Sequence, residues 1–223
     1  MRKSSVAIII AIAVILVCQV NSIETKEENI PLRKLGFDFN IEKIFDIKSF
    51  TFLGQKLTFK YRVAVQNGKA INHIIIESAL GSFKLGNTGV DTETRKMWSE
   101  KIKILTYRFP PLPSVTVGIY ASGDLHYSVK YASDSKDSLE LSLSGDLKAG
   151  SEVIGVTTDM TKMTAGASGN LISVSGTAIV TKNEIKKGFK FYGTTVNTWV
   201  EAKVGLTQLW KKSYKLFDNW SYS

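Results

Sequence analysis

A short pattern recurs at a nearly constant interval in the second half of the chain. Ser122-Gly123-Asp124-Leu125 returns as Ser144–Leu147 and as Ser168–Leu171, and a degenerate copy begins at Tyr192. The glycines of the four copies, which step by 22, 24 and 24 residues, are Gly123, Gly145, Gly169 and Gly193. A period of this size is typical of one supersecondary unit used several times in succession. The spacing therefore predicts a tandem array of similar elements.

The glycines lie inside segments that alternate between apolar and polar residues. From Val115 to Tyr131 the apolar side chains fall on odd positions, and the alternation continues through Gly123. Such alternation marks a strand with one buried face, whereas a turn at Ser-Gly would reset it. Polar residues rich in Asp, Asn and Ser, which favour turns, separate the alternating segments at 132–137, 157–162 and 181–187. We predict four long strands, at about 115–131, 138–156, 163–180 and 188–206.

Glycine within a strand usually marks a bulge, a bend or a close approach of two backbones. In a meander of these strands the four glycines would lie side by side as a row. In the third and fourth strands the apolar set changes from odd to even positions, as a β-bulge would cause; the even set of the fourth strand runs through Val204 and Leu206. The predicted fold is mainly β, an antiparallel meander of long, bent strands that forms a coiled sheet, a sandwich or a barrel-like sheet.

The pattern of apolar residues in the first half of the chain predicts a second β-rich unit. Asn67-Gly68 joins two apolar runs, 57–65 and 71–76, and this dipeptide is the strongest short signal for a hairpin. Acidic residues in the first turn after a capping Asp91 or Thr92 predict one short helix near 91–99. Prolines within 110–113 mark the best internal boundary. We predict an N-terminal lobe at 23–109 and a C-terminal array at 110–223, packed as one globular unit.

The N-terminus has the features of a secretory signal peptide. Arg2 and Lys3 precede an apolar run of 12 residues, too short for a membrane span of about 20 residues. Small and polar residues follow as far as Ser22, after which we predict cleavage. The alternative is an uncleaved anchor formed by residues 6–20. Cys18 is the only cysteine of the chain, so a mature chain would contain no disulfide and no thiolate.

Lysines and aromatic residues gather near the C-terminus of this basic chain, whose formal net charge is +9. Lys203, Lys211 and Lys215 occupy odd positions, opposite the apolar even set. We predict a basic, aromatic surface for an anionic lipid or a glycan, and we exclude nucleic acid because the protein is expected to be exported. The residues assigned to this surface are Trp199, Trp210, Lys211, Lys212, Tyr214, Lys215 and Trp220.

The chain ends in Trp-Lys-Lys-Ser-Tyr-Lys-Leu-Phe-Asp-Asn-Trp-Ser-Tyr, residues 210–222, before the final serine. With this ending and the Gly/Ser-rich alternating strands before it, residues 115–223 resemble an uncharacterised group of small secreted β-rich proteins of ciliated protists. The resemblance implies secretion. It carries no catalytic residue and no ligand.

Residue patterns typical of catalysis are absent from the sequence. His73 and His126 have no metal-ligand spacing, and neither a nucleophile elbow nor a phosphate-binding loop occurs. The expected pairing places Asp124 opposite Asp146, where repulsion is relieved by solvent or, alternatively, by Ca²⁺. We predict no catalytic residue, no metal and no cofactor.

Three functions remain open. The first is a secreted, non-catalytic protein that binds a hydrophobic ligand or a glycan, or that assembles into extracellular structure. The alternative is a membrane-active, pore-forming β-hairpin protein, because alternating Ser/Thr/Gly-rich hairpins are typical of transmembrane barrels. The third is a hydrolase that uses a pair of carboxylates.

Overall fold

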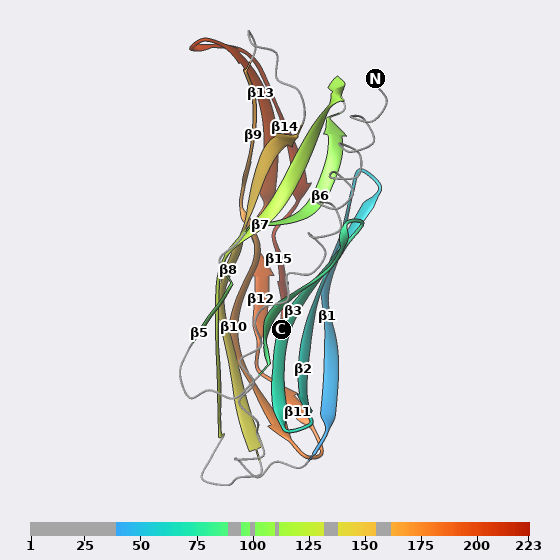
Figure 1. Ribbon diagram of the computed structural model, residues 1–223, viewed down its shortest axis with the longest axis vertical. Coiled ribbons are helices and arrows are strands. Elements are labelled where there is room, and N and C mark those ends of the chain that lie inside the picture. Colours follow the sequence, from blue (N-terminus) through green and yellow to red (C-terminus); the bar gives the residue numbers. More distant parts are fainter. Residues whose placement is uncertain (1–38, 89–94, 99–100, 110–111, 132–137, 155–161) are drawn as a thin grey trace, which may run out of the picture.

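The computed structural model describes residues 39–88, 95–98, 101–109, 112–131, 138–154 and 162–223. In this part of the chain all regular structure is β, and the strands form three antiparallel sheets. The molecule is elongated, and the long strands run along its vertical axis (Figure 1). The predicted fold class, mainly β with long antiparallel strands, is confirmed.

We call the three sheets the N-terminal sheet, the central sheet and the tail sheet. The N-terminal sheet contains β1 (Ile41–Phe52), β2 (Gln55–Gln66), β3 (Lys69–Ser78) and β4 (Gly81–Thr88). The central sheet contains β5 (Arg95–Trp98), β6 (Ile102–Phe109), β7 (Leu112–Tyr131), β8 (Ser138–Ile154), β10 (Asn170–Thr181), β11 (Ile185–Lys187), β12 (Lys190–Gly193) and β15 (Trp220–Tyr222). The tail sheet contains β9 (Lys162–Ser168), β13 (Val196–Val204) and β14 (Thr207–Phe217).

The hairpin predicted at Asn67-Gly68 is the connection between β2 and β3. Gln66 pairs with Lys69 across a two-residue turn. Asn67 and Gly68 have φ angles of 51° and 73°, the left-handed conformations that a tight hairpin of this kind requires. The pairing places Phe59 opposite Ile76 and Tyr61 opposite Ile74 on one fully buried face.

The predicted long strands are present, and they bend at a common level. β7 and β8 pair continuously from Thr116 with Ile154 to Tyr131 with Leu139. The third strand divides into β9 and β10 at Gly169, and the fourth divides into β12 and β13 just after Gly193. Above this level β9 and β13 belong to the tail sheet, and below it β10 and β12 continue the central sheet (Figure 1).

Gly123 and Gly145 lie diagonally across from each other, where β7 and β8 approach closely. Gly145 has a φ of 133°, a conformation that residues with a side chain rarely adopt. A Cβ atom at Gly145 would overlap the carbonyl oxygen of Asp124 and lie 3.0 Å from the Cα atom of Leu125. A Cβ atom at Gly123 would overlap the carbonyl oxygen of Asp146 in the same way. Side chains at these two positions would force the strands apart.

The expected change of alternation in the third strand is also confirmed. The register of β10 against β8 shifts between Asn170 and Ile172, and Leu171 and Ile172 are both fully buried. In the fourth strand the buried set changes from Phe191 to Val196 across the interruption between β12 and β13. Each irregularity keeps apolar side chains in the core on both sides of the bend.

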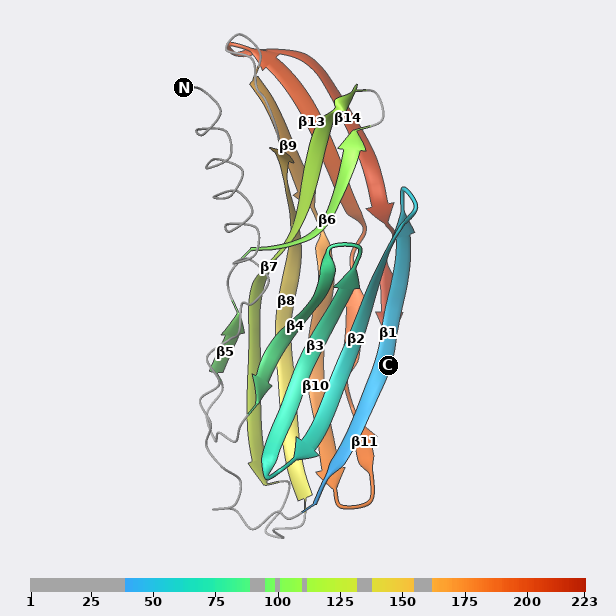
Figure 2. The same cartoon turned by 45° about the vertical axis from the view of Figure 1, so that its right-hand side comes forward.

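The sheets form a sandwich around one continuous hydrophobic core. The N-terminal sheet covers the lower half of the central sheet (Figure 2), and the ring of Tyr61 lies 4.6 Å from that of Phe189. The tail sheet covers β6 and the upper half of β7, where the rings of Phe109 and Trp210 stack at 5.7 Å. Since β6 precedes Pro110 and pairs with β7, the boundary predicted at 110–113 falls within one sheet.

The helix predicted near 91–99 is wrong where the structure describes it. Arg95–Trp98 is strand β5, in which Arg95 pairs with Tyr127 and Lys96 with His126 of β7. The other residues of that segment, 91–94 and 99, lie outside the described residues. A capping pattern of a few residues gives only a weak local preference for helix. Backbone hydrogen bonds to the open edge of β7 stabilise the strand more than that preference stabilises a helix.

Candidate functional site

The outer face of the tail sheet carries three of the predicted binding residues that reach solvent, Trp199, Lys211 and Lys215. Val196, Thr198, Val200 and Ala202 of β13 are buried beneath the sheet. The odd-numbered residues of β13 therefore point outward, and each lies between a partner on β9 and a partner on β14. From the free end of the hairpin downward, these rows are Lys162–Lys203–Gln208, Thr164–Glu201–Lys211, Gly166–Trp199–Ser213 and Ser168–Asn197–Lys215.

Trp199 is the aromatic centre of this outer face. Its ring lies against Gly166 so closely that a Cβ atom at that glycine would overlap the indole. The ammonium group of Lys211 lies over the same ring, 4.9 Å from its centroid. The indole is thus held between the backbone of β9 and a cation, an arrangement that fixes its orientation. Trp199 remains partly exposed.

Glu201 is the single carboxylate in these four rows. It accepts a hydrogen bond of 3.0 Å from Thr164, and its carboxylate lies 2.7 Å from the ammonium group of Lys203. Hydrogen bonds from Lys203 and then from Thr164 lower the pKa of Glu201. The carboxylate therefore stays ionised and neutralises one lysine. Within the described residues, Lys162 and Lys211 form no ion pair, so the face has an excess of positive charge.

The other aromatic residues of the prediction are on the opposite side of the tail sheet or in the core. Trp210 and Tyr214 pack against Phe109, with ring centroids 5.7 and 5.4 Å away. Trp220 is 8% exposed and stacks on Phe59 at 6.2 Å. These side chains stabilise the sandwich; Trp210 and Tyr214 remain partly exposed, whereas Trp220 is buried.

The remaining predicted lysines of β14 are exposed but differ in position. Lys215 lies on the outer face and forms an ion pair of 2.8 Å with Asp218. Lys212 pairs with Val200, so its side chain lies on the same face of the tail sheet as those of Trp210 and Tyr214. The structure thus brings together Trp199, Lys211 and Lys215 on one surface and places Lys212 at the open edge beside them.

The end of the β13–β14 hairpin has an exposed apolar cluster that the sequence did not reveal. Val204, Leu206 and Leu209 are 45%, 103% and 57% exposed. Alternation placed Val204 and Leu206 on the buried even face of the fourth strand, and the structure contradicts this. Near its end the hairpin extends past the strands that it covers (Figure 1), so side chains on both of its faces meet solvent.

The core cavity lined by Phe50, Leu57, Ile104 and Phe217 among others has room for about one water molecule. A hydrophobic ligand of ordinary size needs a pocket of roughly 300–1,000 Å³. This cavity therefore offers no internal site for such a ligand, and the outer surface is the better candidate.

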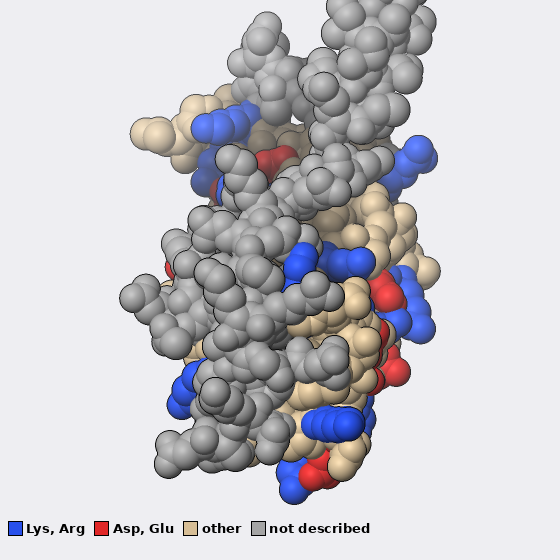
Figure 3. Space-filling view, turned by 60° about the horizontal axis from the view of Figure 1, so that its bottom comes forward, with Lys and Arg blue, Asp and Glu red and all other residues tan. Residues whose placement is uncertain are grey.

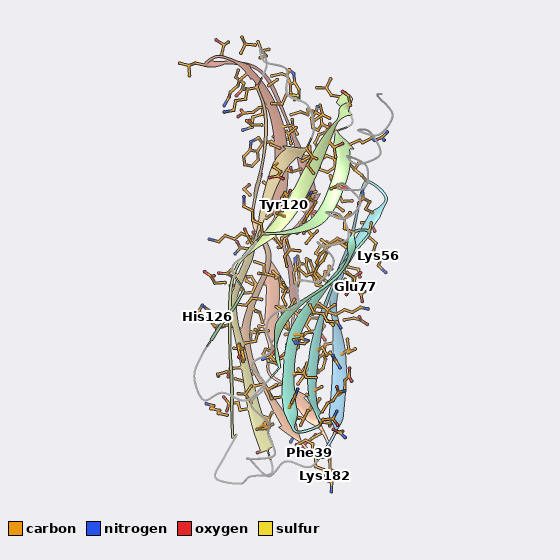
Figure 4. The ribbon with its side chains drawn as sticks, in the orientation of Figure 1. Phe39, Lys56, Glu77, Tyr120, His126 and Lys182 are labelled. Carbon is orange, nitrogen blue, oxygen red and sulfur yellow. The ribbon has the colours of Figure 1, made fainter. Side chains whose placement is uncertain are left out.

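The two histidines considered above lie in different sheets, His73 on β3 and His126 on β7. Burial holds the pKa of His73 at about 4, with smaller effects from Arg62 and Lys84, so this imidazole is neutral at pH 7. His126 lies on the outer side of β7, away from the N-terminal sheet (Figure 4). Burial raises the pKa of Tyr120 to about 12, and its hydroxyl donates to Glu152, so the phenol stays protonated.

Asp124 pairs directly with Asp146, as the position of the intervening turn predicted. In the described part of the chain no group of three or more His, Cys, Asp or Glu side chains is arranged to hold a metal ion. The absence of a metal at this pair therefore stays a prediction.

No protein family, curated protein or solved structure matches this chain. Among the described residues there is no helix with the length and apolar character needed to cross a membrane.

Proposed function

We propose that this is an exported, non-catalytic protein that binds an anionic ligand on the outer face of its tail sheet. The observation that carries the proposal is the pairing of a partly exposed Trp199, held over Gly166, with Lys211 above its ring. An aromatic face beside ammonium groups suits a glycan or lipid headgroup that bears phosphate, sulfate or carboxylate.

Charge supports the proposal. The four outer rows contain Lys162, Lys203, Lys211 and Lys215; Glu201 neutralises one of them and the neighbouring Asp218 pairs with Lys215, which leaves a net positive face. Elsewhere, on the lower end of the molecule, basic and acidic side chains are interspersed (Figure 3). Lysine on an edge strand also discourages unwanted strand pairing, but that role does not explain a tryptophan fixed among the lysines.

Retention on phosphocellulose and on heparin tests the proposal. The double variant Lys211→Gln/Lys215→Gln is expected to elute at a lower salt concentration than the unaltered protein, because each contact to an anion releases counterions. A matched control, Lys182→Gln/Lys190→Gln, removes two exposed lysines outside the tail sheet; Lys182 is at the lower end in Figure 4. If both double variants elute at equally lowered salt concentrations, net charge alone accounts for the binding, and the proposal of a specific binding face is contradicted.

Export is part of the proposal and rests on the charged start and apolar run of residues 1–22. Intact-mass measurement of the protein recovered from the medium is expected to give a chain that begins after Ser22. A secreted protein that retains residues 1–22, or a chain found only in the membrane fraction, would contradict it.

A further inference from the structure

We propose that the end of the β13–β14 hairpin inserts into the headgroup region of an anionic phospholipid bilayer. The inference rests on the proposed function, because it identifies the anionic ligand as a membrane surface. It concerns a segment, Val204–Leu209, that we call the hairpin tip.

The hairpin tip concentrates apolar surface at one point. Val204, Leu206 and Leu209 are 45%, 103% and 57% exposed within six consecutive residues. Isolated exposed leucines are ordinary on protein surfaces, but a projecting cluster marks a contact with a partner or a membrane. The tip contains no charged residue.

The local backbone explains why Leu206 projects. Val204 pairs with Thr207, so Gly205 and Leu206 form the two-residue turn. Gly205 has a φ of 57°, and a tight two-residue hairpin turn requires a positive φ at its first residue. Leu206 consequently occupies the outermost position of the hairpin, which is itself at one end of the molecule (Figure 1).

Lysines follow directly behind the apolar tip. Lys203 is one pair behind the Val204–Thr207 pair and Lys211 is three pairs behind it. Successive pairs are about 3.3 Å apart, so Lys211 lies roughly 10 Å from the last pair. Apolar side chains of interfacial segments sink roughly 5–10 Å into the boundary between headgroups and acyl chains, which brings these ammonium groups to the level of the phosphates. Figure 3 shows the uncharged tip at the upper left with basic side chains behind it.

The same dimensions indicate shallow insertion. A strand that spans a bilayer needs about 9–11 residues, whereas only residues 204–210, shared between two strands and their turn, are free of charge at this end of the hairpin. Glu201, Lys203, Lys211 and Lys212 lie immediately below on the two strands. Their burial in hydrocarbon would be too costly, so insertion stops at the tip.

A second copy of the chain fits the hairpin tip less well than an anionic bilayer does. Stable protein interfaces bury about 800 Å² on each partner, far more than three aliphatic side chains supply. Lysines around the tip would also repel the same lysines of a symmetric partner. An anionic bilayer accepts both the apolar and the basic part.

Vesicle flotation tests the inference, with phosphatidylcholine vesicles and with vesicles of phosphatidylcholine and phosphatidylserine. The mature protein is expected to bind the mixed vesicles, and Leu206→Ser is expected to weaken this binding about tenfold or more, because one leucine side chain is lost from the apolar phase. Leu80→Ser is the matched control, since Leu80 is a 41% exposed leucine in the turn between β3 and β4, away from the tip (Figure 2). It is expected to bind like the unaltered protein.

Lys211→Gln/Lys215→Gln separates this inference from the proposed function. If this variant loses vesicle binding while Leu206→Ser retains it, the basic face stands and the tip inference is overturned. If phosphocellulose and heparin retain the unaltered protein but no vesicle does, the tip inference again fails alone. If the unaltered protein binds neither phosphocellulose, nor heparin, nor any vesicle, both the proposed function and the tip inference are overturned.

Three further measurements examine the depth of insertion, leakage of the vesicles and self-association. A Leu206→Cys variant of the mature chain, labelled with an environment-sensitive dye, is expected to shift its emission to shorter wavelength on mixed vesicles. Release of a trapped dye from the vesicles would overturn shallow insertion in favour of a pore. An oligomer that Leu206→Ser converts to monomer would show instead that the tip binds another copy of the chain.

Discussion

Replacing Gly145 by valine is expected to lower the free energy of unfolding by about 3 kcal/mol. The φ of 133° at this position costs a residue with a side chain about 1–3 kcal/mol. A Cβ atom would lie 3.0 Å from the Cα atom of Leu125, whereas carbon atoms prefer about 3.5–4.0 Å. Overpacking of this kind adds roughly 1–3 kcal/mol, and the usual preference of strands for a side chain over glycine recovers less than about 1 kcal/mol.

Urea denaturation followed by circular dichroism measures the effect. Gly150→Ala is the matched control on the same strand, because no atom lies within 4 Å of the Cβ position there. That variant is expected to be neutral or slightly more stable, by up to about 1 kcal/mol. If Gly145→Val matches Gly150→Ala, the close approach of β7 and β8 is not what requires glycine, and the account of the bend is wrong.

Three other outcomes follow from the structure. Gly166→Ala is expected to displace the indole of Trp199 from β9, which increases acrylamide quenching in the parent protein but not in a Trp199→Phe background. Burial lowers the pKa of His73 to about 4 from the model-peptide value of 6.5, so between these values the unfolded chain binds a proton that the folded chain does not. Stability should therefore fall as pH drops through this window, by up to about 3 kcal/mol in urea melts, and His73→Gln should reduce the loss. Finally, the thermal midpoint should be equal in calcium and in chelator, and a drop of several degrees with chelator would show that Asp124 and Asp146 hold a metal.

The register of the central sheet could be predicted because it depends on local information. Once a turn is predicted within 132–137, alternation fixes which residues of β7 and β8 face the core, and the pairing of Asp124 with Asp146 follows. The shift near Asn170 was visible for the same reason: a buried face constrains every second residue. Packing against the N-terminal sheet was not predictable in this way, since it depends on contacts between distant segments.

The candidate site was only partly predictable. Alternation assigns a side chain to one of two faces, but it cannot tell where a sheet extends beyond the layer that covers it. Val204 and Leu206 share the parity of the buried Val200 and are nevertheless exposed. Trp210 shows a related difficulty: a tryptophan among lysines was assigned to the ligand, while its partly exposed ring stacks on Phe109. β5 was missed because its strand partner is distant in sequence.

The bend divides each long strand into an upper and a lower segment. The length of each segment is fixed independently, because each packs against a different sheet. An inserted residue between Gly123 and Tyr131 would turn the following side chains of β7 to the wrong face. An insertion between Gly123 and Val115 would do the same to the upper segment alone. Insertions and deletions in homologous chains should therefore concentrate in the connections between strands, and the number of residues from each bend to the end of its strand should be preserved. Such a length pattern would identify distant members of this fold after residue identities have diverged.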